Sequence, residues 1–430
     1  MFQDIIRNVQ NLYSVDARPW IVGYSGGKDS TLLVSLVFEA IASLPAKERI
    51  KDVTIACTDT RVEIPPVIAR VSKELRLMQT HSEINGLNIS TQLLTPRIDQ
   101  TFWVNIIGRG YPPPNRTFRW CTQRLKIDPV SELTRSKIGH WGEVIILLGA
   151  RTNESGSRAQ TMGSRSKNEL GLRRHDDLPR GWIYTPIEHL STQNVWDYLL
   201  GGDSPWGGDN DGLFQLYKDA AGGECPMVLD QSTPACGNSR FGCWTCTVVE
   251  KDKASEGLLA SGESRMGALL SFRDTLIQYR EFDNGYRDNV RKNGQDGPGP
   301  LTVESRKALL NQLLAVQKEV GYNVISEDEL YWIQTYWKSS RKPDNGNGVA
   351  NIILNKRSET MNEAETERTL ANIAEEVALE KGVQIETLKR LVAKVDEYSE
   401  SHRAQGLPDE LLQILEDDLR EIVNSGERNV

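Results

Sequence analysis

Residues 21–31 read IVGYSGGKDST, and this stretch constrains the fold more than any other part of the sequence. The apolar residues 21–24 are typical of a parallel strand that is covered on both faces. Gly26 and Gly27 allow a tight turn and a close approach of backbone N–H groups to a ligand. Apolar residues then recur at helical spacing through residues 29–42, so the turn leads into a helix. We expect Asp29 or Ser30 to cap the first turn of that helix.

A strand, a glycine turn and a helix N-terminus together form an anion site, to which Lys28 adds a positive charge. The spacing is not that of the common P-loop, because only three residues separate Gly23 from the Gly27–Lys28 pair. The segment resembles instead the PP-loop of the ATP pyrophosphatases, which bind the pyrophosphate of ATP and adenylylate a substrate. The resemblance implies that ATP is bound with Mg²⁺ and that Lys28 and Asp29 act in catalysis. The ATP-binding residues implied here are Ser25, Gly26, Gly27, Lys28, Asp29 and Ser30.

Strand and helix patterns alternate through the first half of the sequence, which predicts an α/β fold with a doubly wound parallel sheet. We expect strands at residues 21–24, 53–57, 89–94, 143–148 and 182–187, and helices at 65–80 and 193–200, the second capped by Ser191. Ligands of such sheets bind beyond the carboxyl ends of the strands, so the loops after the first, second and fourth strands should converge. These loops add Asp59, Gly149, Arg151, Glu154 and Arg158 to the expected nucleotide site, where the two arginines could face polyphosphate.

Composition indicates a globular protein with more than one unit, since 38% of its 430 residues are hydrophobic and 26% are charged. No run approaches the ~20 apolar residues that span a bilayer, and the N-terminus lacks a signal-peptide pattern. We therefore expect a cytoplasmic protein that binds no membrane. We divide it into a nucleotide domain (1–212), a cysteine-cluster segment with helices (213–292) and a mainly helical, acidic region (301–430), with a glycine- and proline-rich linker at 293–300.

The net charge of −8 argues at first against a nucleic-acid partner, but its distribution changes that interpretation. Residues 358–430 contain 18 acidic residues against 8 Lys and Arg, whereas residues 97–126 contain six basic residues and one acidic residue, Asp99. The basic segment is either a solvated face or a contact surface for nucleic-acid phosphates. We expect the acidic region to pack on protein rather than to lie along DNA.

The cysteines are unevenly placed: Cys225, Cys236, Cys243 and Cys246 fall within 22 residues. Four thiolates suit either structural Zn²⁺ or a 4Fe–4S cluster, and the irregular spacing favours the cluster without deciding the choice. Cys121 lies among three arginines, which would stabilise a thiolate that carries sulfur as a persulfide. Its alternative role is that of a small buried apolar residue, the role that we expect for Cys57.

Three motifs in order, SGGKDS, LGARTNESGSR and TPIEHLSTQNVWDYL, resemble the PAPS-reductase-like branch of the PP-loop superfamily over about residues 20–247. Within that branch, FRWCT (118–122) and RFGCWTC (240–246) resemble the DndC family, the ATP-using sulfurtransferases of bacterial DNA phosphorothioation. This resemblance implies a 4Fe–4S cluster on the four clustered cysteines and Cys121 as a catalytic residue. The implied partners are DNA, a cysteine desulfurase as sulfur donor, and other phosphorothioation-system proteins.

Three other functions stay open at this point. A tRNA-thiolating enzyme would use the same adenylylation and sulfur transfer. A phosphoadenylylsulfate reductase would be expected to carry a reactive cysteine near its C-terminus, and no cysteine follows Cys246. A non-catalytic nucleotide-sensing scaffold would bind ATP without releasing AMP and pyrophosphate.

Overall fold

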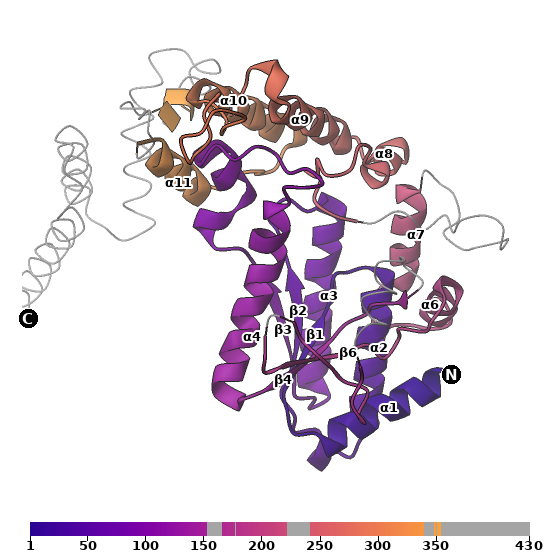
Figure 1. Ribbon diagram of the computed structural model, residues 1–430. Helices are drawn as coiled ribbons and strands as arrows, with labels where there is room; N and C mark the ends of the chain where they lie inside the picture. Colours follow the sequence, from indigo (N-terminus) through magenta and orange to yellow (C-terminus); the bar gives the residue numbers. More distant parts are fainter. Residues whose placement is uncertain (153–165, 177, 222–240, 339–347, 350, 354–430) are drawn as a thin grey trace, which may run out of the picture. The chain divides into compact units, whose positions relative to one another are not determined.

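The computed structural model describes residues 1–152, 166–176, 178–221, 241–338, 348–349 and 351–353 (Figure 1). The chain forms two units, Met1–Val349 and Ala350–Val430, and the first contains nearly all of the described residues. Among the described helices, none combines the length and the apolar character that crossing a membrane requires.

A mostly parallel sheet forms the centre of the first unit. Its described strands lie in the order β3-β2-β1-β4-β6-β5, and only β5 runs antiparallel to its neighbour. The strands are β1 (Trp20–Gly23), β2 (Val53–Thr58), β3 (Ile89–Leu94), β4 (Val144–Leu147), β5 (Arg173–Arg174) and β6 (Gly181–Tyr184). The order reverses between β1 and β4, which are neighbours in space although β2 and β3 separate them in the sequence. Ligands of open parallel sheets bind at such a switch point.

Helices cover both faces of the sheet, as predicted (Figure 1). The main core receives α1 (Phe2–Val15), α2 (Lys28–Ala42), α3 (Pro65–Ile84), α6 (Thr192–Leu199) and α7 (Asn210–Ala220), and a smaller core on the other face receives α4 (Asp128–Trp141). Strand residues alternate between the faces, so Trp20 and Val22 lie in the main core and Ile21 in the smaller one. The helix α2 is almost entirely buried, and its own apolar residues therefore lie on all sides of the helix rather than on one face.

The predicted strands are all present, and Ser191 caps α6 as predicted by accepting the backbone N–H of Asn194. The helices expected within residues 213–292 include α8 (Lys253–Ala260) and α9 (Arg265–Arg280), between which the chain turns with Gly262 at φ 106°. Two further helices follow, α10 (Val303–Val320) and α11 (Glu327–Lys338).

Residues 293–300 do not form the predicted linker. Backbone bridges join Arg287 to Leu301 and Val290 to Asp296, and Leu301 is buried. The glycines and prolines of this segment therefore make the turns of a closed loop that belongs to the first unit.

Candidate active site

The PP-loop segment joins β1 to α2 at the carboxyl edge of the sheet. Gly26 adopts a φ of +72°, a left-handed conformation that side chains rarely adopt. A Cβ atom at this position would also lie 2.4 Å from Cγ2 of Val71 on α3. Glycine is therefore required here by the backbone conformation and by the packing of α3 against the loop.

Two serines close the loop. The hydroxyl oxygen of Ser30 accepts the backbone N–H of Ser25 at 3.1 Å, and the same hydroxyl donates to the carbonyl of Gly27 at 2.9 Å. Gly27 precedes the first turn of α2, and no side chain caps that turn. The prediction that Asp29 or Ser30 caps the helix is therefore wrong. An uncapped helix start that follows a curled loop is the arrangement that binds phosphates in many proteins.

The charged residues of the loop form a chain of ion pairs. Lys28 Nζ lies 3.0 Å from Oδ2 of Asp29, and Arg151 Nε lies 2.6 Å from Oδ1 of the same carboxylate. The Arg151 side chain is only 2% exposed and also donates to the carbonyl of Leu190 at 3.1 Å and to the Thr192 hydroxyl at 3.3 Å. Arg151 thus contacts the carboxylate of Asp29, and through it the loop, from inside the protein.

The loops after β1, β2 and β4 meet at this edge. A Cβ atom on Gly149, which follows β4, would lie 2.8 Å from the backbone oxygen of Asp29, so these two loops are in close backbone contact. Asp59 follows β2, and its carboxylate accepts the backbone N–H of Arg61 at 2.7 Å. Burial raises the pKa of Asp59 despite this hydrogen bond. The switch point between β1 and β4 is therefore lined by the polar groups of converging loops.

Tyr217 of α7 connects the PP-loop to the cysteine-rich segment. Its hydroxyl oxygen accepts the backbone N–H of Lys28 at 3.3 Å, and its ring centre lies 5.3 Å from Lys28 Nζ. The ring of Phe241 packs edge-on against Tyr217 with centroids 4.8 Å apart. Burial raises the pKa of Tyr217, so the phenol stays neutral. Phe241 lies two residues before Cys243, and a single aromatic pair therefore separates the loop from the cysteine segment.

The cysteine segment is anchored beyond the end of β2. The backbone of Cys243 pairs with that of Glu63, and the backbone N–H of Trp244 donates to the carbonyl of Val62 at 3.0 Å. The backbone N–H of Cys246 donates to the carbonyl of Cys243 at 3.0 Å, which forms the tight turn expected of a C-x-x-C pair. The two thiols therefore belong to one short turn held against the nucleotide-binding half of the protein.

Polar groups surround the Cys243 thiol. Thr60 Oγ1 lies 3.2 Å from its sulfur, and Glu63 Oε1 lies 3.8 Å away. Lys126 Nζ is 3.6 Å from the same Glu63 oxygen. Burial, and next the Glu63 carboxylate, raise the pKa of Cys243. Within the described residues, no group of three or more His, Cys, Asp or Glu is arranged to hold a metal ion.

Cys121 precedes a short π-helix, Thr122–Ile127, and faces the same region. Burial, followed by the electrostatic effect of Cys246, raises the pKa of Cys121. This direction contradicts the prediction that the neighbouring arginines stabilise its thiolate. The guanidinium of Arg116 lies instead 3.8 Å from Glu250, and that of Arg124 bonds to Gln100. Nearness in the sequence did not bring these charges to the sulfur.

Cys57 is a core residue, as predicted. It is 4% exposed and packs in the main core. Burial, and next Glu63 and Asp59, raise the pKa of its thiol to about 12. Its sulfur is therefore protonated and plays an apolar part in packing.

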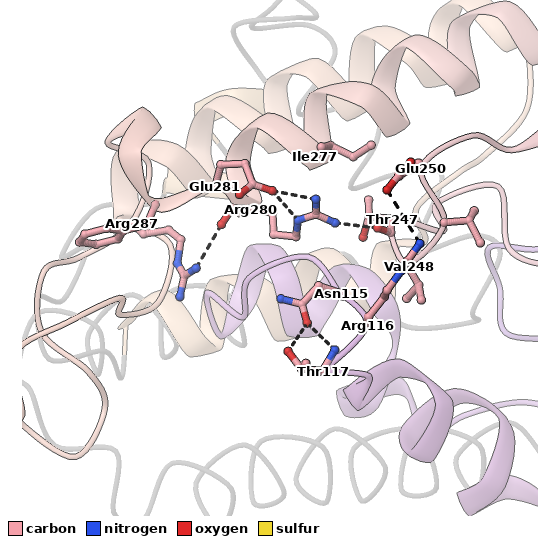
Figure 2. A pocket seen from close by; sticks show the side chains of 12 residues that line it. Asn115, Arg116, Thr117, Thr247, Val248, Glu250, Ile277, Arg280, Glu281 and Arg287 are labelled. Carbon is pink, nitrogen blue, oxygen red and sulfur yellow. Dashed lines mark hydrogen bonds and ion pairs between the residues drawn. The ribbon is translucent and has the colours of Figure 1, made fainter.

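A cavity of about 600 Å³ lies beside the cysteine segment (Figure 2). Its walls come from Asn115–Thr117 before Cys121, from Thr247–Glu250 after Cys246, and from the end of α9 with the loop that follows. Arg280 donates to the carbonyl of Thr247 at 2.6 Å, which ties α9 to the segment. The cavity thus lies beside the chain that follows Cys246, and its lining residues include none of the PP-loop.

Several expected site residues lie outside the described part of the chain: Glu154, Arg158, Cys225 and Cys236. The acidic region at residues 358–430 lies outside it as well. Their predicted roles stay predictions.

Glu188 and Tyr217 are site residues that sequence reasoning missed. Glu188 is 3% exposed; it bonds to Arg173 at 2.9 Å and to Lys167, and its carbonyl accepts the backbone N–H of Thr152 at 3.0 Å. Burial opposes its ionisation, but the hydrogen bonds from Lys167, Arg173 and Thr185 outweigh burial and lower the pKa of Glu188 to about 2. Glu188 stands in the TPIEHLSTQ motif, which offered a signal, whereas nothing in the sequence around Tyr217 did.

The fold and the loop define an open, mostly parallel α/β protein with a phosphate-binding type of strand–loop–helix unit at its switch point. A family model described as the phosphoadenosine phosphosulfate reductase domain matches residues 19–249, and the chain belongs to this family. An uncharacterized protein of Methanocaldococcus jannaschii is 23% identical over 242 residues, which are 56% of this chain and 39% of that protein. The chain thus spans well under half of that relative's length.

Solved structures with some similarity include two proteins of named activity. A phosphoadenylyl-sulfate reductase from Candida auris, in a phosphate complex, has a TM-score of 0.30 and 11% identity, with 46% of this chain and 78% of that chain covered. The U34-tRNA thiolase NcsA from Methanococcus maripaludis, with its 4Fe–4S cluster, has a TM-score of 0.29 and 13% identity, with 65% and 80% covered.

Proposed function

We propose that the protein is an ATP-dependent sulfurtransferase of DNA phosphorothioate modification, which adenylylates a backbone phosphate and allows sulfur to replace a non-bridging oxygen. The observation that carries this proposal is the continuous contact from the PP-loop through Tyr217 and Phe241 to the cysteine segment. A nucleotide site and a set of thiols in one compact unit suit a reaction that activates an oxygen and then exchanges it for sulfur. The likeness of residues 118–122 and 240–246 to the DndC family supports DNA as the acceptor.

In the first step, ATP lies with its β- and γ-phosphates on the loop of Ser25–Ser30. A non-bridging oxygen of the DNA phosphate attacks the α-phosphorus, the bond from that phosphorus to the pyrophosphate oxygen breaks, and pyrophosphate leaves. Lys28 stabilises the charge that develops on the pyrophosphate, as phosphoryl transfer requires. Arg151 pairs with Asp29, whose carboxylate holds the Lys28 ammonium, so Arg151 positions these two residues of the loop. Mg²⁺, when bound, neutralises part of the phosphate charge.

In the second step, a sulfur nucleophile attacks the adenylylated phosphorus and AMP leaves with the original oxygen. Activation is needed because an unmodified phosphate oxygen is too poor a leaving group. Cys121 is the proposed sulfur carrier: the outer sulfur of its persulfide, supplied by a cysteine desulfurase, attacks the phosphorus and stays joined to Cys121 through the sulfur–sulfur bond. A second thiol then attacks the Cys121 sulfur, which releases the phosphorothioate and leaves a disulfide that an external thiol reductant reduces. The raised pKa of Cys121 means that the thiol is protonated at neutral pH, so it has to lose its proton before it receives sulfur.

The described half of the cysteine cluster fits a metal centre. Cys243 and Cys246 share one turn, as a pair of metal ligands would require. The Thr60 hydroxyl and the Lys126 ammonium favour a thiolate at Cys243 and partly offset burial and the Glu63 carboxylate, which raise the pKa of this thiol. Cys225 and Cys236 would complete a four-thiolate set for a 4Fe–4S cluster. When bound, such a cluster supplies a redox-active centre.

Two measurements test the proposal. Purified protein with ATP and DNA should release AMP and pyrophosphate, and Lys28→Ala should abolish this release while the exposed-site control Lys47→Ala retains it. Mass spectrometry of nuclease-digested DNA should find phosphorothioate linkages in cells that contain the protein and none in cells that lack it. ADP as the main product would contradict the pyrophosphatase assignment, and sulfur found only in tRNA, or turnover of sulfonucleotides, would replace DNA as the acceptor.

A further inference from the structure

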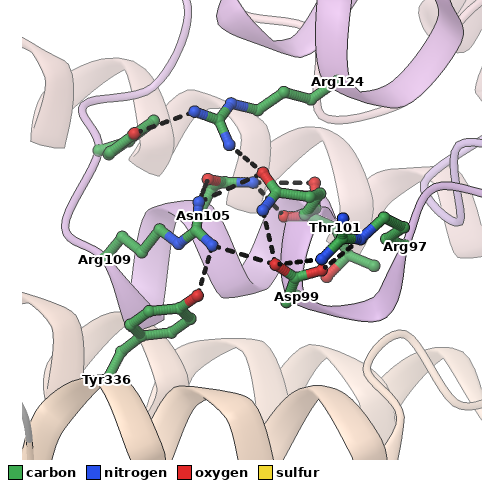
Figure 3. Close-up of polar contacts among 9 residues, drawn as sticks. Arg97, Asp99, Thr101, Asn105, Arg109, Arg124 and Tyr336 are labelled. Carbon is green, nitrogen blue, oxygen red and sulfur yellow. Dashed lines mark hydrogen bonds and ion pairs between the residues drawn. The ribbon is translucent and has the colours of Figure 1, made fainter. Parts of the chain in front are cut away.

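A cluster of cations lies outside the nucleotide and cysteine sites, around residues 97–124 (Figure 3). Arg109 and Arg124 both donate to one neutral atom, Oε1 of Gln100, the first at 3.2 Å. Asp99 is the carboxylate that contacts this group, 3.4 Å from Arg109 and 3.2 Å from Arg97. This network joins three guanidinium groups to one carboxylate, which contacts two of them, so positive charge is concentrated here and only partly compensated.

Aromatic rings hold these cations in place. Arg124 donates to the hydroxyl of Tyr111 at 3.1 Å, and Lys292 Nζ lies 4.2 Å from the centre of the same ring. Tyr111 is itself fixed edge-on against Trp120, with centroids 5.6 Å apart. Arg109 lies over the ring of Tyr336 at 4.5 Å. Aromatic faces orient a cation without cancelling its charge, so the groups stay able to attract an anion.

The loop of residues 286–301 contributes to the cluster. Partial desolvation, and next the charges of Arg109, Arg124 and Arg306, lower the pKa of Lys292, as expected where cations lie close to one another. Arg306 lies behind them, 6% exposed, and donates to the carbonyl of Gly108 at 2.6 Å. Lys292 itself is exposed. A bound anion would therefore relieve repulsion among groups that the fold holds together.

We propose that Arg109, Arg124 and Lys292, arranged around Tyr111, bind the phosphate backbone of a nucleic acid. Lys292 is exposed, Arg109 and Arg124 are partly exposed, and the three cations come from separate parts of the chain. Such a spread set suits the repeated charges of a backbone better than a single small anion, which would be enclosed. Arg124 belongs to the π-helix Thr122–Ile127, which begins directly after Cys121, so the proposed phosphate site and the proposed sulfur carrier lie on adjoining parts of one segment. The choice of DNA as this nucleic acid rests on the proposed function.

The experiment measures binding of the full chain to a fluorescent DNA duplex by anisotropy at several salt concentrations. The logarithm of the binding constant falls linearly with the logarithm of the salt concentration, and each lost phosphate contact should make this slope less steep by about 0.9 for duplex DNA. We expect this change in slope, with affinity about tenfold weaker at low salt, for Lys292→Gln and for Arg124→Gln. Arg124→Lys keeps the charge and should retain the slope. Lys47→Gln, an exposed lysine after α2, should change neither quantity.

The proposal would be overturned if the slope were unchanged in both glutamine variants. It would also be overturned if Arg124→Lys showed the same reduced slope as Arg124→Gln, because Arg124 would then have a merely structural role. A parallel titration with tRNA separates this inference from the proposed function. Binding to tRNA that depends on these cations, without binding to DNA, supports the phosphate site and contradicts DNA modification. Unchanged slopes with normal DNA phosphorothioation in cells contradict the phosphate site alone.

Discussion

Replacing Arg151 should destabilise the protein more than replacing Lys28, although the lysine is the residue expected at the phosphates. Arg151 is 2% exposed and has three partners: the carboxylate of Asp29, the carbonyl of Leu190 and the hydroxyl of Thr192. Arg151→Met would leave the Asp29 carboxylate largely buried with one cation, Lys28 Nζ at 3.0 Å. The ion pair with Arg151 would be gone.

The magnitude follows from these partners. Breaking a buried ion pair by removing one partner costs about 3–5 kcal/mol, and the remaining Lys28 contact places this case near the lower value. Lys28→Met leaves the Asp29–Arg151 pair intact and removes a hydrogen bond to a carboxylate and a contact with the Tyr217 ring, so we expect a smaller loss of about 2 kcal/mol. Adding Asp29→Asn to Arg151→Met removes the uncompensated charge and should recover about 1–2 kcal/mol.

The assay is urea unfolding followed by tryptophan fluorescence, with the free energy of unfolding obtained by linear extrapolation. ATP cleavage, measured on the same preparations, should be lost in Lys28→Met despite its folded state. The reasoning would be refuted by an Arg151→Met variant that loses less than about 1 kcal/mol, or less than Lys28→Met loses. A double variant no more stable than Arg151→Met would show that the unpaired carboxylate is not the cause.

Four further predictions concern other parts of the chain. Glu188→Gln should make the free energy of unfolding depend less on pH in acid, as measured by unfolding at several pH values. The folded pKa of about 2 lies below the ordinary value of 4.5, so the carboxylate stabilises the fold above pH 4.5 and this contribution disappears as the pH falls toward 2. Tyr217→Phe should keep the fold and slow AMP formation about fivefold, because Lys28 loses the acceptor of its N–H; an unchanged rate would contradict a role for the phenol. Anaerobic metal analysis should find iron and labile sulfide in the Cys121→Ser variant, although this variant should lose sulfur transfer. The Cys243→Ser variant should contain neither iron nor labile sulfide, and stoichiometric zinc without iron in the unmodified protein would show that the cluster assignment is wrong. Deleting residues 358–430 should leave DNA affinity unchanged or raised at low salt, and a marked fall in anisotropy titrations would count against the like-charge argument.

The sequence by itself determined the elements and the anion site, because both depend on local patterns. Apolar strands followed by amphipathic or buried helices predicted the parallel sheet, and the two glycines before Lys28 predicted the turn whose positive φ at Gly26 the structure shows. The rule that strand ends share one edge predicts that the loops after β1 and β4 meet, and the close approach of Gly149 to the Asp29 backbone confirms this. Cys57 was correctly assigned to the core from its place at the end of a buried strand.

Only the tertiary structure decided which side chains meet. Arg151 pairs with Asp29 across 122 residues, and Tyr217 reaches Lys28 across 189, and no local pattern encodes either contact. Arg116 and Arg124 lie near Cys121 in the sequence but contact Glu250 and Gln100, so burial rather than their charge sets the direction of the pKa shift of Cys121. Spacing along the chain fixes where a residue lies on its element, whereas the direction of its side chain and its distance from water depend on the elements that pack against it.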